Sequence, residues 1–164
     1  MAIWEDPRIP RQGWECLGVE HIPGDEEPQT CEVCQVAIIR WIHHMRHDAW
    51  PVQYDAGCIC AGKMEQSPAA AKEREQSAKS RERRRKGWAS RKWKITAIGN
   101  LTLKIDGYRI TLFERDGSFH AVIMRLSDER QWWSKRHYDN IEVVRAASFE
   151  AFEHVKSRDK ETER

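Results

Sequence analysis

The sequence has no long apolar run. None of its stretches approaches the roughly 20 consecutive apolar residues that a membrane-spanning helix requires, and its mean hydropathy is −0.80. The N-terminal stretch MAIWEDPRIPRQGW has mixed charge, is interrupted by proline and lacks the apolar segment of a secretory signal peptide. We therefore predict a cytoplasmic protein that does not associate with a membrane.

Material for a large hydrophobic core is also scarce. The 164 residues allow one ordinary domain or two small ones, and 33% of them are charged. Buried surface must therefore come from a few aliphatic runs and from eight tryptophans. A small domain of this kind often needs an additional staple such as a metal ion.

Cysteines are few, but four of the five fall within residues 30–66. In the cytoplasm thiols stay reduced, so closely spaced cysteines favour a metal site or a catalytic group over disulfides. Cys31-x-x-Cys34 can form a tight knuckle, and Cys58-x-Cys60 can supply an opposite pair. Four thiolates complete the tetrahedron that Zn²⁺ prefers, and such a closed site leaves no position for a small-molecule substrate. We predict a structural Zn²⁺ on these four cysteines.

Other ligand sets remain open. His43 and His44 lie between the two cysteine pairs, so an imidazole can replace one thiolate, with His43 in place of Cys58 as the main alternative. Unligated buried cysteines or a redox pair are further interpretations of the same spacing.

The order of a Cys-x-x-Cys, then His43-His44, then a second cysteine group resembles that of zinc-containing HNH endonucleases. In that family a histidine after the first knuckle acts as general base. The family also has a second Cys-x-x-Cys followed by histidine, and an asparagine between. This chain instead has Cys-x-Cys followed by Ala61-Gly62, and no asparagine before Asn100. A general base without its catalytic metal cleaves phosphodiesters poorly, so we predict no enzyme activity.

Residues 28–94 resemble a group of small uncharacterised proteins of bacteria and their mobile elements. The shared features are the Cys-x-x-Cys, an Ile-Arg-x-x-His stretch, and the Gly-Cys-x-Cys-Ala-Gly ending at Gly62. The resemblance implies metal binding at Cys31, Cys34, Cys58 and Cys60 but no activity. Gln35 stands where a glycine usually follows the knuckle.

A strongly basic segment follows the cysteines. Residues 72–94 carry eleven Lys or Arg and three acids, a net charge of +8 that leaves −6 for the rest of the chain. Ser67 and Pro68 suit the N-cap and first position of a helix. Arginines bind phosphates and indoles can stack on bases, or the same residues form a solvated face. The nucleic-acid-binding residues predicted here are Arg81, Arg83, Arg84, Arg85, Lys86, Trp88, Arg91 and Lys92.

The remaining sequence predicts hairpins followed by a helix. Turn signals at Gly99-Asn100, Asp106-Gly107 and Asp116-Gly117 separate β-branched and apolar runs, and Asp139 with Glu142 has the spacing of a capping box. We predict an α+β fold: a zinc-knuckle module, a long basic helix, and an antiparallel β-meander capped by a C-terminal helix. The boundaries are 1–63 for the zinc module, 64–94 for the basic helix or linker, 95–157 for the β-meander and helix, and 158–164 for a disordered tail.

The C-terminal part resembles the sheet and helix of integrase arm-type DNA-binding domains and, with the preceding helix, the element order of double-stranded-RNA-binding domains. Together with the basic segment this predicts a zinc-stabilised protein that binds DNA or RNA. The alternative is a protein-interaction factor of a mobile element, an inhibitor or adaptor. Its acidic N-terminal loop, VEHIPGDEEPQT, would dock on a nucleic-acid-processing complex.

Overall fold

The computed structural model describes residues 2–162. The chain divides into two compact units, Met1–Glu82 and Arg83–Arg164, and each is described by itself. The described residues form three α-helices and three antiparallel sheets, so the predicted α+β class is confirmed. None of the helices in this part of the chain combines the length and the apolar character needed to cross a lipid bilayer.

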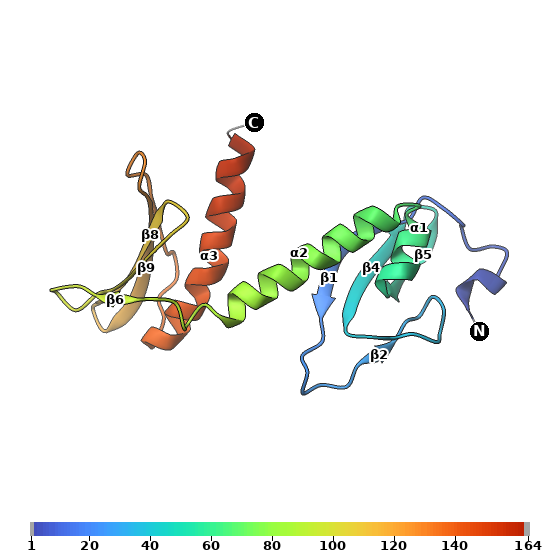
Figure 1. Ribbon diagram of the computed structural model, residues 1–164, viewed down its shortest axis with the longest axis horizontal. Coiled ribbons are helices and arrows are strands. Elements are labelled where there is room, and N and C mark those ends of the chain that lie inside the picture. Colours follow the sequence, from blue (N-terminus) through green and yellow to red (C-terminus); the bar gives the residue numbers. More distant parts are fainter. Residues whose placement is uncertain (1, 163–164) are drawn as a thin grey trace. The chain divides into compact units, whose positions relative to one another are not determined.

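The N-terminal unit is built on a three-stranded sheet in the order β1-β4-β5 (Figure 1). Its elements are η1 (Ile3–Glu5), β1 (Glu15–His21), β2 (Gln29–Thr30), β3 (Ile38–Ile39), β4 (Trp41–His47), β5 (Trp50–Ala56), α1 (Cys58–Met64) and the first part of α2 (Pro68–Lys86). Strand β4 pairs antiparallel with β5, with His43 opposite Ala56 and Met45 opposite Tyr54.

Alternation along β4 sends His43 and Met45 into the interior, where α1 packs against the strand. The join between α1 and α2 is close, since a Cβ added at Gly62 would lie 2.8 Å from the Cα of Pro68. Ser67 caps α2 as predicted, because its Oγ accepts the Ala70 N–H at 3.3 Å. The start of α2 thereby belongs to the N-terminal unit, with Ala71 in its core.

The C-terminal unit is a five-stranded antiparallel sheet in the order β10-β9-β8-β7-β6 with one long helix. The elements are β6 (Lys94–Ile95), β7 (Leu101–Ile105), β8 (Tyr108–Arg115), β9 (Ser118–Arg125), β10 (Gln131–Trp133) and α3 (Ile141–Thr162). The Asp106-Gly107 and Asp116-Gly117 pairs form two-residue turns, and all four residues have positive φ, which is the geometry of primed hairpin turns.

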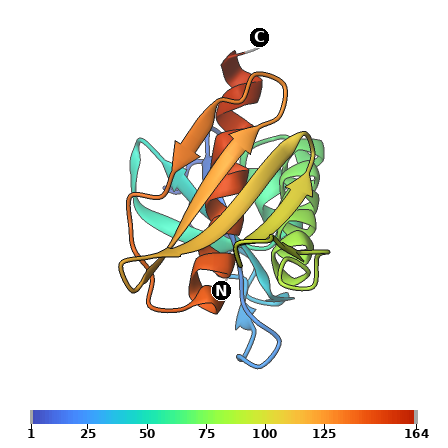
Figure 2. The same cartoon turned by 90° about the vertical axis from the view of Figure 1, so that its left-hand side faces the viewer.

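Helix α3 lies against one face of this sheet, as Figure 2 shows, and contacts β8 and β9. Tyr108, Ile110 and Leu112 alternate along β8 and are buried in this interface. Together with Phe149 and Phe152 of α3 they form the second core. Each unit therefore has its own hydrophobic core.

Two details of α3 differ from expectation. Its N-cap side chain is Asn140, whose Oδ1 accepts the Val143 N–H at 2.9 Å, rather than Asp139. The helix also continues through Thr162, so residues 158–162 of the expected disordered tail are helical, while 163 and 164 lie outside the described residues. The reason is a tertiary contact: Asp159 is buried, accepts a hydrogen bond from the Tyr108 hydroxyl at 2.5 Å and pairs with Arg125 at 3.1 Å.

Candidate functional site

Cys31 and Cys34 lie in the loop that joins β2 to β3. Backbone hydrogen bonds close this loop tightly: the Cys31 N–H donates to the Ala37 carbonyl at 2.8 Å, and the Gln35 N–H donates to the Cys31 carbonyl at 2.8 Å. Both thiols are thus held on a short, well-defined turn. Cys31 is fully buried and Cys34 is partly exposed.

Gln35 occupies the left-handed region with φ of 56°, the conformation for which glycine is usual. We expect Gln35→Gly to stabilise the N-terminal unit by up to about 1 kcal/mol and Gln35→Val to destabilise it by about 1–2 kcal/mol, because a Cβ is unfavourable in this conformation. Urea unfolding of the metal-loaded protein measures both. Gln53→Gly in β5 is the matched control and should lower stability, because Gln53 has an ordinary strand conformation. Equal effects of glycine at the two positions would contradict this account of the turn.

Backbone N–H groups donate to the sulfur atoms of Cys34 and Cys31. Hydrogen bonds from the N–H groups of Ala37 and Val36 lower the pKa of the Cys34 thiol to about 7, and the Gly57 N–H donates to the Cys31 Sγ at 3.4 Å. Burial, together with the adjoining Cys31 and Cys34 thiols, raises the pKa of Cys60 to about 12. N–H donors stabilise thiolates and are typical partners of metal-bound sulfur.

The structure brings three of the four predicted cysteine ligands together. The sulfur atoms of Cys31, Cys34 and Cys60 lie within 4.8 Å of one another and could hold a metal ion. Cys58 is not in this group. Cys58 and Cys60 both belong to α1, where residues two apart are rotated by roughly 200° and point to opposite sides of the helix. The helical conformation of the Cys-x-Cys pair therefore separates the two thiols.

Cys58 belongs instead to a second group with His43 and Glu75, whose ligand atoms also lie within 4.8 Å of one another. The expected alternative, in which His43 replaces Cys58 beside the other three cysteines, does not describe this arrangement either. His44 points to the opposite face of β4, where its ring nitrogens contact Asp55 Oδ1 at 2.7 Å and Glu20 Oε2 at 3.1 Å. Sequence reasoning missed Glu75, because nothing in the spacing connects α2 to β4.

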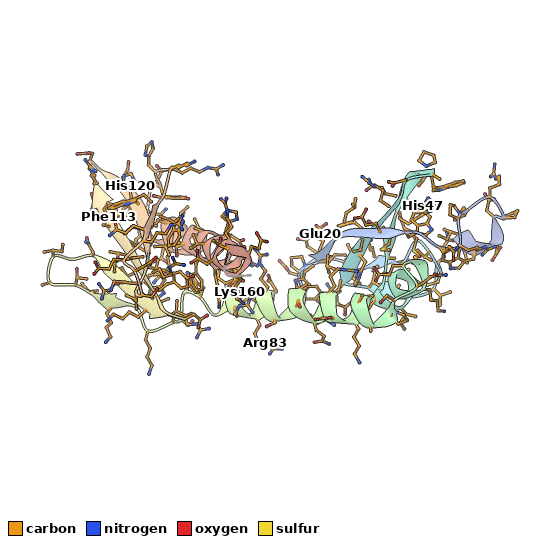
Figure 3. The ribbon with its side chains drawn as sticks, turned by 90° about the horizontal axis from the view of Figure 1, so that it is seen from above. Glu20, His47, Arg83, Phe113, His120 and Lys160 are labelled. Atoms are coloured by element: carbon orange, nitrogen blue, oxygen red, sulfur yellow. The ribbon has the colours of Figure 1, made fainter. Side chains whose placement is uncertain are left out.

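The predicted phosphate-binding side chains are exposed. This holds for Arg81, Arg83, Arg84, Arg85 and Lys86 on α2 and for Arg91 and Lys92 after it. Figure 3 shows Arg83 projecting from its helix. Arg84 also forms an intramolecular salt bridge, in which its Nη2 lies 2.7 Å from Glu153 Oε2 of α3.

Trp88, which we expected to stack on bases, lies in the core of the C-terminal unit and is 2% exposed. Its ring stacks on Phe152 at 5.5 Å between centroids, and its Nε1 donates to the Ser148 Oγ at 3.0 Å. A buried indole offers no face to a nucleic-acid base, so Trp88 is removed from the predicted interface. Helix α2 ends at Lys86, and the chain that follows brings the Trp88 indole against Phe149 and Phe152 of α3.

Comparisons with protein-family models, curated proteins and solved structures found no match to the chain. The resemblances to the mobile-element group and to integrase arm-type domains therefore stay predictions. The functional interpretation therefore depends on two structural features. One is the three-cysteine cluster that could hold a metal ion, and the other is the run of exposed cations at the end of α2.

Proposed function

We propose that the protein is a zinc-stabilised nucleic-acid-binding protein in which the cations at the end of α2 contact phosphates. One observation carries the proposal: seven Lys and Arg side chains between residues 81 and 92 are exposed. Helix α2 has few apolar residues, and Ala71 near its start is its buried residue. Its C-terminal turn, Arg83–Lys86, is exposed to water or to a partner.

The arrangement of the cations favours phosphate over a single acidic side chain. Arg83 and Arg85 are two positions apart on a helix, so they project in different directions, and Arg91 and Lys92 follow the helix end. A polyanion with many phosphates can contact several of these cations at the same time, whereas a single carboxylate contacts one or two. Affinity would then come mainly from neutralised phosphates, with weak sequence preference.

Zinc is the proposed metal at the cluster of Cys31, Cys34 and Cys60. Thiolate sulfur is a soft ligand that suits Zn²⁺ and disfavours Mg²⁺ and Ca²⁺. The β2–β3 loop would then be a zinc knuckle, tied through Cys60 to the first turn of α1. Because α1 leads directly into α2, the metal would also stabilise the start of the basic helix. We propose this structural role and no catalytic one.

Salt-dependent binding to labelled duplex DNA, single-stranded DNA and structured RNA tests the proposal. The double variant Arg83→Ala/Arg85→Ala should weaken binding and reduce the slope of log K against log salt by about 2, since each lost phosphate contact contributes about 0.9. The matched control is Arg158→Ala/Lys160→Ala, which removes two exposed cations from the last turns of α3. Equal slopes for the two variants, or no binding at low salt, would overturn the proposal.

A protein partner is the second candidate, and exposed apolar side chains favour it. Val36, Ile38 and Ile59 are 81%, 65% and 75% exposed. Large aliphatic side chains that are exposed close together often mark a protein-interaction surface. The acidic loop with Asp25, Glu26 and Glu27 is exposed as well. Charge reversal of these three acids should abolish capture of a protein partner and spare nucleic-acid binding. The Arg83→Ala/Arg85→Ala variant should weaken nucleic-acid binding and spare capture of the protein partner.

A further inference from the structure

Three potential ligands from three different elements meet beneath the sheet of the N-terminal unit. His43 comes from β4, Cys58 is the first residue of α1, and Glu75 lies on α2. The His43 Nε2 and Glu75 Oε2 are 3.2 Å apart, and one ligand atom of each of the three residues lies within 4.8 Å of the other two. The convergence is tertiary, since Glu75 follows His43 by 32 positions.

His43 and Glu75 are more buried than ionisable side chains usually are. His43 is 0% exposed, and the side chain of Glu75 is 14% exposed. Placing an imidazole and a carboxylate in an interior costs free energy unless each has good partners. A cation bound between them would compensate that cost, because all three groups can act as its ligands.

The donor set has the composition of a zinc site. A thiolate, an imidazole and a carboxylate are the three ligand types that Zn²⁺ takes in proteins. The presence of sulfur disfavours Mg²⁺ and Ca²⁺, which prefer oxygen ligands. Three protein ligands leave one of four tetrahedral positions for a further ligand, as they also do at Cys31, Cys34 and Cys60.

A cavity lies beside Cys58 and Glu75, and Cys31 and Cys60 line it too. It has a volume of about 280 Å³, and Cys58 and Glu75 line it together with the apolar side chains of Ile39, Trp41 and Ile59. A fourth ligand, water or a small anion, could therefore reach a metal ion held by these residues.

The surroundings can adapt to a bound cation. The second oxygen of Glu75 now pairs with Lys79, whose side chain is 36% exposed and can turn into solvent. With a metal on Nε2, the ring proton of His43 would lie on Nδ1, which faces the Cys16 Sγ at 4.0 Å. Arg74 Nη1 now lies 3.4 Å from Nδ1 and would turn away, and its Nη2 remains held by Glu65 at 2.7 Å.

We propose that His43, Cys58 and Glu75 bind a second Zn²⁺ ion, distinct from the ion at Cys31, Cys34 and Cys60, with an open coordination position facing the cavity. The proposal gives Cys58, which α1 turns away from Cys60, ligand partners of its own. It does not depend on nucleic-acid binding, and it uses ligands that the first site does not share.

Metal content of the purified full chain, loaded with Zn²⁺ and measured by mass spectrometry, tests the second site. We expect about two zinc ions per wild-type chain and about one in both Cys58→Ala and Glu75→Gln. Both substituted side chains are partly exposed, so the variants should fold, which circular dichroism checks. The matched control is Glu73→Gln, an exposed acid on α2 that lies outside both groups. This control should keep the wild-type metal content.

Titration with Co²⁺ separates this proposal from a four-cysteine site. Under the proposal, Cys58→Ala removes one set of cobalt bands and leaves the tighter three-thiolate spectrum unchanged. A metal content that is the same in the wild type, Cys58→Ala and Glu75→Gln would overturn the proposal, whereas one metal that both variants lose would place the ion here and not at the three cysteines. A Cys58→Ala variant in which the site of Cys31 loses affinity would also overturn the proposal, because Cys58 would then be the fourth ligand of the first site.

Discussion

Removal of the metal proposed for the cluster of Cys31, Cys34 and Cys60 is expected to unfold the N-terminal unit and to leave the C-terminal unit folded. Structural zinc contributes an apparent binding free energy of about 10–16 kcal/mol in small zinc-dependent peptides. That is as large as the roughly 5–15 kcal/mol by which whole domains are stable. The core of the N-terminal unit includes two of the three thiols themselves, so it should not survive their release.

Two-dimensional NMR of the full chain measures this outcome unit by unit. After chelation, the amides of Val33 and Met45 should lose their dispersed shifts, whereas those of Ile110 and Ile123 should keep theirs, because the two pairs lie in separate cores. Cys31→Ala should reproduce the effect of the chelator, and Cys16→Ala should not. Identical melting with and without chelator would contradict a structural metal at this cluster.

Trp88→Ala is expected to cost about 3–5 kcal/mol of stability, the usual effect of removing a fully buried aromatic side chain. Trp88 contacts Phe149 edge-on with 5.3 Å between centroids and stacks on Phe152. Its Nε1 donates to the Arg145 carbonyl at 3.1 Å as well as to Ser148. The substitution leaves a cavity against α3 and removes these hydrogen bonds.

Thermal unfolding should show the loss as a lower Tm of the C-terminal unit by more than about 10 °C, given about 4–8 °C per kcal/mol for a domain of this size. Trp133→Ala is the matched control, because Trp133 is 60% exposed and should change stability by less than about 1 kcal/mol. Metal content should stay at the wild-type level in both variants. An unchanged Tm together with lost nucleic-acid binding would restore Trp88 to the interface and contradict its burial.

Local chemistry made several elements predictable. Pro68 after Ser67 marks the start of α2, and the Asp-Gly pairs at 106–107 and 116–117 mark hairpin turns. Each depends on the conformational preference of one or two residues. Tyr108, Ile110 and Leu112 alternate along β8 and form its buried face, as the period of two of a strand requires.

Partners far apart along the chain were not predictable. The helix continues to the end of α3 because Asp159 accepts a hydrogen bond from Tyr108 and forms a salt bridge with Arg125. No local pattern in the polar sequence KSRDKETER predicts these contacts. The same holds for Trp88, which sits in a basic segment typical of a solvated helix but packs on Phe149 and Phe152.

The sequence by itself determined that four cysteines crowd into one segment, that a basic helix follows, and that hairpins and a helix end the chain. These are statements about composition and short-range spacing. Only the tertiary structure decided which ligands meet. Once the Cys-x-Cys pair begins a helix, its two thiols point to opposite sides, and Cys58 meets His43 and Glu75 instead of Cys31 and Cys34. Direction in three dimensions depends on backbone conformation, which residue spacing alone does not specify.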